Sequence, residues 1–305
     1  MGRGSYTAND WSQLRSSKGL TKENTISNVF ANNKALSVYD SRNIKMRESR
    51  DSKESPYSTP IILGFDVTAS MGYLAKELAV NSINNTILTL YDQNILPSPH
   101  ILCSAIGDCK SDASPLQATQ FEADIRIIKQ LTDLFLEGGG GGNGGESYNL
   151  LWYFAAKHTV SDCDEKRHKK GFLFTVGDDK CHPDLSISEI SKVFNDTSEY
   201  SLSNEELLRM ARKKYNIFHI HIETGHYNDQ QIFSDWRKIM PGYCTVIQKS
   251  DIGYLSNLIT SIMLVTLGAE INATLKSINQ SIAERISRSM AYIQIENKKK
   301  NTLTF

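Results

Sequence analysis

The chain of 305 residues lacks any apolar run long enough to cross a membrane. Its most hydrophobic stretch, LSNLITSIMLVTLGA at 255–269, has the length of a core helix. It also lacks the apolar segment of a signal peptide, and Tyr6 stands where a myristoylation motif requires serine or threonine. We therefore expect a cytoplasmic protein with no membrane partner.

Cysteine pairs and net charge are lacking as well. The five cysteines, an odd number without a CxxC pair, favour reduced thiols over a disulfide framework or a structural zinc site. Lysine plus arginine and aspartate plus glutamate number 34 each, so no bulk positive field would attract nucleic acid. Hydrophobic residues make up 40% of the chain, which is enough for the core of one large domain or two small ones.

Residues 1–57 form a polar segment rich in serine, asparagine, lysine and arginine, without sustained periodicity. Isolated aromatic residues at Trp11, Phe30 and Tyr39 favour an N-terminal arm that lies over the domain. A disordered tail is the alternative.

Residues 58–268 alternate short apolar runs with segments of helical spacing. The apolar runs are typical of buried parallel strands. The alternation predicts an α/β fold with a doubly wound, mostly parallel central sheet and helices on both faces. The expected strands are PIILGFD (60–66), HILCSAIGD (100–108), GFLFTVGDD (171–179), YNIFHIHIE (215–223) and YCTVIQ (243–248). The expected helices are 71–93, 121–138, 147–159, 205–214 and 252–267.

Residues 269–305 carry apolar residues at intervals of three and four, which predicts one long amphipathic helix. In one interpretation this helix packs on its own domain. In the other it is a short coiled coil through which the protein forms oligomers or binds a partner. The apolar stripe consists of Ile271, Leu275, Ile278, Ile282, Ile286, Met290 and Ile293.

A glycine loop, EGGGGGNGGESYN, occupies 137–149. Glycine runs before a helix often hold phosphate, because free backbone N–H groups and the helix N-terminus both favour an anion. The P-loop pattern, however, requires lysine and a hydroxyl after the last glycine, and here Glu146 follows Gly145. A dinucleotide fingerprint should directly follow a strand, whereas the preceding LTDLFLEGG is typical of a helix. The loop therefore calls for another explanation.

Acidic residues end three of the expected strands: Asp66, Asp108 and Asp178. The ends of parallel strands meet at one edge of a sheet, so we expect these side chains to lie near one another. Thr68 and Ser70 follow Asp66 at alternate positions, and oxygen-only ligands suit Mg²⁺. The alternative is that Ser70 simply caps the next helix.

With its two other loops, the segment FDVTAS resembles the D-x-S-x-S signature of von Willebrand factor type A (vWA) domains. The resemblance covers about 58–268 and implies a Rossmann-like vWA fold with a metal-ion-dependent adhesion site. Asp66, Thr68 and Ser70 would hold Mg²⁺ or Mn²⁺, together with Asp178 in FTVGDD from the third loop. The loop GGNGGES falls where that family has its second ligand loop.

The second loop departs from the family pattern, because no threonine follows the glycines. Ser147 and Glu146 are the oxygen side chains at that place, and we favour Ser147 as the ligand, with Glu146 close behind. Glu146 would add a negative charge, holding the metal more tightly and attracting an acidic partner less. Asp108 and Asp179 are candidates to support the ligands from behind, and Asp112 lies on the same edge.

The resemblance implies a metal-dependent protein-binding module, an adaptor whose Mg²⁺ takes a carboxylate from a partner protein. Intracellular members often act beside AAA-type ATPases, and this chain also resembles uncharacterised vWA proteins of bacteria and phages. One alternative is a Mg²⁺-dependent hydrolase or a phosphate- or nucleotide-binding enzyme using the same acids. Another is a structural assembly protein of a phage or mobile element.

Two histidine-containing groups invite other interpretations. His219 and His221 share one strand face near His226, but without a third ligand at a set spacing they favour packing over metal binding. Cys181 and His182 follow the third loop, where a cysteine nucleophile is conceivable but no orienting group is evident. We therefore expect no catalytic residue in this chain.

Overall fold

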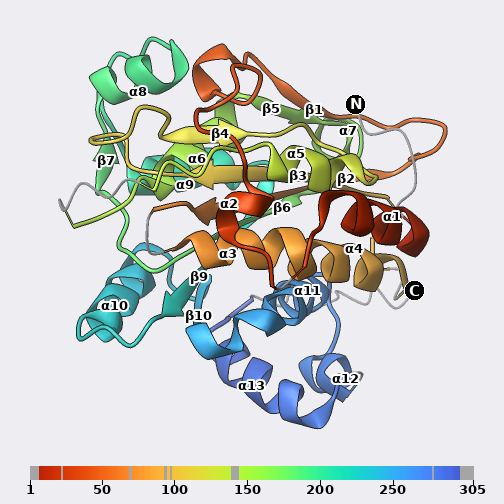
Figure 1. Cartoon of the computed structure of the whole chain (residues 1–305). Helices are drawn as coiled ribbons and strands as arrows, with labels where there is room; N and C mark the ends of the chain where they lie inside the picture. The colour runs from red at the N-terminus through yellow and green to blue at the C-terminus, as the bar shows by residue number, and fades with distance from the viewer. Residues whose placement is uncertain are drawn as a thin grey trace, which may run out of the picture.

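The central sheet lies at the middle of the molecule, with its strands in the order β10-β9-β6-β2-β3-β4 (Figure 1). All neighbours are parallel except β4, which pairs antiparallel with β3. The strands are β2 (Ser58–Asp66), β3 (Ser98–Ile106), β4 (Leu116–Ala118), β6 (Gly171–Gly177), β9 (Tyr215–Glu223) and β10 (Cys244–Gln248). The five predicted strands and the α/β fold class are confirmed. The computed structural model describes residues 7–21, 23–68, 71–92, 95–96, 98–138, 144–276 and 278–295.

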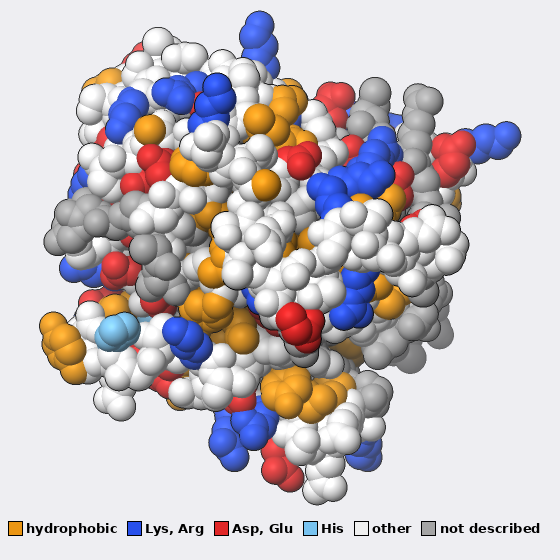
Figure 2. All heavy atoms as spheres, viewed as in Figure 1, with side chains coloured by type: hydrophobic (Ala, Val, Ile, Leu, Met, Phe, Trp, Pro, Cys, Tyr) orange, Lys and Arg blue, Asp and Glu red, His pale blue; other side chains and the backbone are white. Residues whose placement is uncertain are grey.

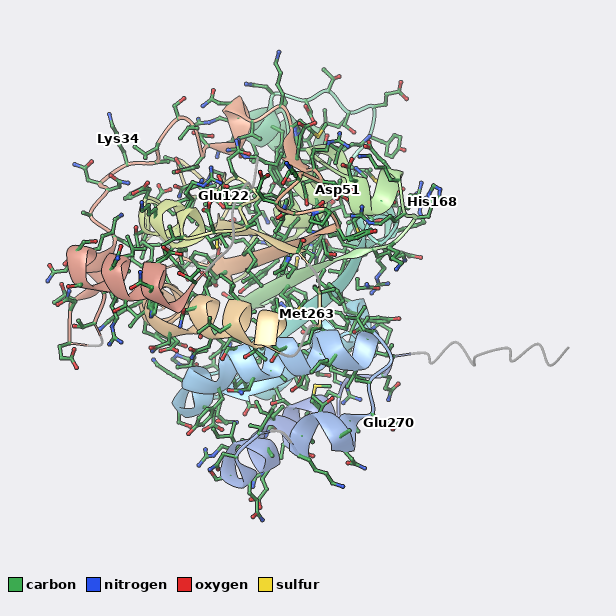
Figure 3. The ribbon with its side chains drawn as sticks, turned by 90° about the vertical axis from the view of Figure 1, so that its right-hand side faces the viewer. Lys34, Asp51, Glu122, His168, Met263 and Glu270 are labelled. Carbon is green, nitrogen blue, oxygen red and sulfur yellow. The ribbon has the colours of Figure 1, made fainter. Side chains whose placement is uncertain are left out.

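Helices cover both faces of this sheet, because its strands are apolar on both sides. In β2, Ile61, Leu63 and Phe65 face one core cluster and Ile62 faces the other. The first face is covered by α3 (Gly72–Glu77), the π-helical η3 (Leu78–Ser82), α4 (Ile83–Asp92), α5 (Arg126–Thr132) and α11 (Leu255–Thr266). The second is covered by α6 (Tyr148–Lys157), α8 (Ile187–Phe194), α9 (Asn204–Ala211) and α10 (Asp229–Ile239). Met263, labelled in Figure 3, is fully buried on α11, which packs against α4.

The helix expected at 121–138 is shorter, because α5 ends at Thr132. Beyond it, the side-chain amide of Gln117 on β4 donates to the Phe135 carbonyl at 2.7 Å and accepts the Phe135 N–H at 3.0 Å. These two bonds hold the segment beside the sheet edge as an extra strand would. The smaller elements are α7 (Asp162–Glu165), η4 (Lys249–Tyr254) and the antiparallel pair β7 (Asp184–Leu185) and β8 (Leu202–Ser203).

The N-terminal arm lies over the domain, as expected from its aromatic residues. Trp11, Phe30 and Tyr39 are all buried, so the disordered alternative is wrong for the described part of the arm. It nevertheless contains helices that the sequence pattern did not predict, and its strand β1 pairs in parallel with β5. Its elements are α1 (Ala8–Lys18), α2 (Ile26–Val29), η1 (Ser41–Asn43) and β1 (Arg47–Ser49), and β5 is Thr159–Ser161. Asp51, labelled in Figure 3, accepts hydrogen bonds from Ser58 and Arg167 and so joins the arm to the start of β2.

The C-terminal segment is not the single long helix that its apolar stripe predicted. It forms two helices, α12 (Ile271–Lys276) and α13 (Gln280–Met290). Asn279 is the N-cap of the second helix, because its side chain accepts the Ser281 N–H at 3.0 Å. Ile286 and Met290 are buried in the same core cluster as α11 (Figure 1, lower part). The stripe therefore packs on its own domain, and oligomerisation through it stays a prediction.

Two further observations bear on the expected partners. On the face drawn in Figure 2, acidic and basic side chains are interspersed rather than gathered into a field of one sign. No helix in the described parts of the chain is long and apolar enough to span a membrane. The first core cluster joins residues of all three predicted segments, and the boundaries at 57 and 268 stay predictions.

The close approach of α6 to β2 gives a first test of the packing. A Cβ at Gly64 would overlap the Leu151 side chain and lie 2.9 Å from Cδ1 of Ile106. Gly64→Ala should therefore lower the free energy of unfolding by about 1–3 kcal/mol, as overpacked cores do. Thermal unfolding measures this, with Gly253→Ala as control, because a Cβ at Gly253 meets nothing within 4 Å. Equal melting temperatures for the two variants would contradict this packing.

Candidate functional site

The expected acids lie at one edge of the sheet, at the carboxyl ends of the parallel strands on the left of Figure 1. Asp66 is the last residue of β2 and Asp178 directly follows β6, its neighbour in the sheet. Asp108 follows β3 on the other side of β2. The sheet topology therefore brings the three strand ends together, as the sequence predicted.

Asp66 is fully buried, and both of its carboxylate oxygens accept hydrogen bonds. Oδ1 accepts from the Thr68 backbone N–H at 2.8 Å and from its hydroxyl at 2.7 Å. Oδ2 accepts from the Tyr148 hydroxyl at 3.0 Å. Asp66 and Thr68 are thus in contact, and Thr68 lies in the turn that follows β2.

The Asp66 carboxyl group carries no counter-charge from these donors, since all three are neutral. Burial, with a smaller contribution from the charge of Asp178, raises its pKa to about 7, even though the hydrogen bonds from Thr68 and Tyr148 lower it. The half-buried Asp178 therefore lies close enough to Asp66 to repel it. Ser70, the third predicted ligand of this turn, lies outside the described residues.

Glu146 lies beside the third loop, because a short parallel bridge joins it to Cys181. Its N–H donates to the Lys180 carbonyl at 2.9 Å, and its carbonyl accepts the His182 N–H at 3.1 Å. The side chain is only 5% exposed, and Oε2 is buried without a hydrogen-bond partner among the described residues. Burial, followed by the charges of Asp66 and other acids, raises the pKa of Glu146 to about 9.

Ser147 directly precedes α6, and its hydroxyl has other partners. The oxygen accepts the Cys109 N–H at 2.9 Å and lies 3.3 Å from Oδ1 of Asp108. Its hydrogen-bonding capacity is therefore used within the loop that follows β3. Of the two candidates in the glycine loop, Glu146 has the oxygen without a hydrogen-bond partner in the described parts of the chain and the electrostatic coupling to Asp66.

Asp108 and Asp179, the two acids predicted to support the ligands, lie in the loops that follow β3 and β6. Asp108 is fully buried and its Oδ1 lies 2.9 Å from Nε2 of His182, which ties the loop after β3 to the third loop. Asp112 accepts the Asp108 N–H at 2.9 Å, and burial raises its pKa. Asp179 is half-buried, and its carbonyl accepts the Trp236 indole N–H at 3.0 Å.

Two residues at this site were not predicted from the sequence: Tyr148 and the histidine partner of Asp108. Tyr148 is the second residue after Glu146 and is fully buried. A Cβ at Gly177 would overlap its hydroxyl, so the glycine before Asp178 was the one available signal that something lies against this strand end. The sequence alone could not say which side chain it is.

His219, His221 and the five cysteines are buried as packing residues, whereas His226 is exposed. His219 and His221 share one buried face of β9, where His219 bonds Thr175 and stacks on Trp236. Burial raises the pKa of the Cys181 thiol to about 12, which makes it a poor nucleophile. Among the described residues, no three His, Cys, Asp or Glu side chains are arranged to hold a metal ion by themselves. The predicted ligand set also uses hydroxyls, including that of Ser70.

By chemical type, the donors at this edge of the sheet fit a hard divalent cation, although the arrangement of the described residues alone does not form a metal site. The donors are carboxylates and a hydroxyl, the ligands that Mg²⁺ and Mn²⁺ prefer. Two buried carboxyl groups with raised pKa values, one with an unpartnered oxygen, are costly to ionise without a nearby positive charge. A cation bound by Asp66, Thr68, Glu146 and Asp178 would supply that positive charge in place of protons.

Comparison with known proteins gives a likeness of structure alone. No family model matches the sequence, and no curated protein matches it. The pilus adhesin SpaC from Lactobacillus rhamnosus GG, in its open conformation, matches with a TM-score of 0.46 and 10% identity, over 71% of this chain and 31% of that one. Proximal thread matrix protein 1 from the mussel byssus matches with a TM-score of 0.43 and 13% identity, over 68% of this chain and 47% of that one. The chain spans less than half the length of either protein.

Proposed function

We propose that this chain is a metal-dependent protein-binding module of the vWA type, with Mg²⁺ or Mn²⁺ held by Asp66, Thr68, Ser70, Glu146 and Asp178. The observation that carries the proposal is Oε2 of Glu146, which is buried, unpartnered among the described residues and coupled to Asp66. When bound, the cation would offset most of the negative charge of these acids and offer a coordination position to a partner.

Glu146 is preferred to Ser147 as the ligand in this proposal, which reverses the preference drawn from the sequence. With Asp66, Glu146 and Asp178 all ionised, the site would carry three negative charges against the two positive charges of the cation. A partner carboxylate would then be attracted less than at a site with a hydroxyl in place of Glu146. The acidic partner side chain, an AAA-type ATPase assembly and a cytoplasmic, bacterial or phage setting stay predictions.

Metal binding is tested by thermal unfolding with added Mg²⁺ or Mn²⁺. Because the ion would bind only the folded chain, the melting temperature should rise with its concentration, by an amount equivalent to about 2.7 kcal/mol at 100 times Kd. ATP at constant free Mg²⁺ should add nothing.

Each alternative outcome has a distinct meaning. A melting temperature that ignores both cations would contradict the proposed site. A rise that requires ATP would favour the nucleotide-binding enzyme over the binding module, and the acids would then serve phosphate-bound Mg²⁺.

A further inference from the structure

A buried aromatic cluster lies beneath the candidate site, formed by Tyr148, Trp236 and His219, each fully buried. The Trp236 and His219 rings stack with centroids 3.4 Å apart. The Tyr148 ring meets both of them edge to face, with centroids 5.3 Å away in each case. The three rings come from α6, α10 and β9 and form one packed unit.

Two polar atoms of this unit point to the ligand loops. The Tyr148 hydroxyl donates to Oδ2 of Asp66 at 3.0 Å, in the first loop. The Trp236 indole N–H donates to the carbonyl of Asp179 at 3.0 Å, in the third loop and next to Asp178. The loops are therefore held from below by two side chains that touch each other.

The fit at Tyr148 leaves no room for a looser arrangement. Its hydroxyl occupies the space where Gly177 has no Cβ, and a Cβ there would also lie 2.9 Å from Cβ of Asp66. Because Thr68 holds one Asp66 oxygen and Tyr148 the other, the carboxylate cannot rotate without losing a hydrogen bond. Fixed orientation of ligands by a supporting shell of this kind strongly affects metal affinity.

We propose that Tyr148 and Trp236 are positioning residues of the metal site: Tyr148 orients Asp66, Trp236 fixes the loop of Asp178, and their contact couples cation binding to α10. This inference rests on the proposed function. It adds that the affinity for the cation depends on two hydrogen bonds from a buried aromatic unit, in addition to the ligands themselves.

The chain offers a matched control for each residue. Tyr153 lies one turn further along α6, and its hydroxyl donates to Oδ2 of Asp196 at 2.7 Å, so Tyr153→Phe removes an equivalent phenol bond away from the site. Trp152 is also fully buried and packs edge to face on Trp236, with ring centroids 6.2 Å apart, but its indole nitrogen has no hydrogen-bond partner among the described residues. Trp152→Phe therefore removes a buried indole without removing a loop contact.

The experiment measures Mg²⁺ affinity by calorimetry for the full chain and these variants. Tyr148→Phe and Trp236→Phe should each raise the Kd for Mg²⁺ about tenfold or more, as losses of supporting hydrogen bonds do. Tyr153→Phe and Trp152→Phe should leave it within about twofold, although they too lower thermal stability. If loss of stability alone weakened binding, the Kd for Mg²⁺ would thus rise in all four variants. A positioning effect would raise it only in Tyr148→Phe and Trp236→Phe.

A second measurement does not depend on the folding of the two key variants. In Trp152→Phe the remaining tryptophans are Trp11 and Trp236. The tryptophan fluorescence of this variant should change as Mg²⁺ is added, and half of the change should occur at the Mg²⁺ concentration that equals the calorimetric Kd. Unchanged fluorescence despite Mg²⁺ binding, or Tyr148→Phe binding like wild type, would overturn the inference and leave the proposed function standing. If wild type binds neither Mg²⁺ nor Mn²⁺, both fall.

Discussion

Replacing Asp66 with alanine or asparagine is expected to abolish the stabilisation of this protein by Mg²⁺. At 100 times the wild-type Kd that stabilisation is about 2.7 kcal/mol, or roughly 5–10 °C in melting temperature for a domain of this size. Both variants should melt at the same temperature with Mg²⁺ and with EDTA. Asp66 has this effect because it is the buried acid on which Thr68 and Tyr148 converge and to which Glu146 is coupled.

Asparagine is the more informative of the two substitutions. It keeps the shape of the side chain and an oxygen for Thr68, while the charge that burial disfavours is removed. The metal-free Asp66→Asn variant should therefore be at least as stable as metal-free wild type at pH 8. Asp235→Ala, which removes a surface carboxylate paired with Lys238, serves as the control and should keep the full response to Mg²⁺. A response retained in Asp66→Asn would show that the site is elsewhere.

The strands and the acids at their ends could be predicted because both depend on local pattern. Runs such as FLFTV are short and mostly apolar on both faces, which is typical of a strand buried in a parallel sheet. Once the strands are known, topology alone brings Asp66, Asp108 and Asp178 to one edge. No atomic detail is needed for this step.

Two of the helices that the sequence pattern did not predict, α1 and α8, carry a signal in their caps. In α1, Trp11 and Leu14 are the only large apolar residues, so the helix is marked by its caps, the Thr7–Asp10 capping box and the left-handed Gly19. In α8 a capping box of Ser186 and Glu189 marks the start of the helix in the same way, but the prediction considered only the spacing of apolar residues. Capping would have found both helices.

The supporting side chains of the site could not be predicted, because they depend on contacts between distant segments. Tyr148 reaches Asp66 only because α6 crosses β2 and β6 where Gly64 and Gly177 leave room. The choice between Glu146 and Ser147 likewise depended on which oxygen other loops had already engaged. Sequence patterns name the candidate groups but do not assign their partners.

Glu146→Gln should separate the two candidate ligands through the pH dependence of stability. In the metal-free protein the pKa of Glu146 is raised to about 9, mainly by burial, from an ordinary value of 4.5. Between these values the folded chain binds more protons than the unfolded chain, so the free energy of unfolding falls as pH rises. Asp66, with a pKa of about 7, adds to this fall only below pH 7.

From pH 7 to 9 in EDTA, wild type should thus lose about 1.4 kcal/mol of stability per pH unit through Glu146. Glu146→Gln has no ionisable group at position 146, so its free energy of unfolding should change little between pH 7 and 9. Mg²⁺ should stabilise wild type more at pH 8 than at pH 6, because the cation replaces protons on both acids, and should stabilise Glu146→Gln little at either pH.

Ser147→Ala provides the opposite expectation within the same loop. It removes the acceptor of the Cys109 N–H and should lower stability by about 1 kcal/mol at every pH, with the slope and the Mg²⁺ response unchanged. If Ser147→Ala instead loses the response to Mg²⁺ while Glu146→Gln keeps it, the serine hydroxyl is the ligand. The site would then carry one negative charge fewer, and an acidic partner would bind it more strongly.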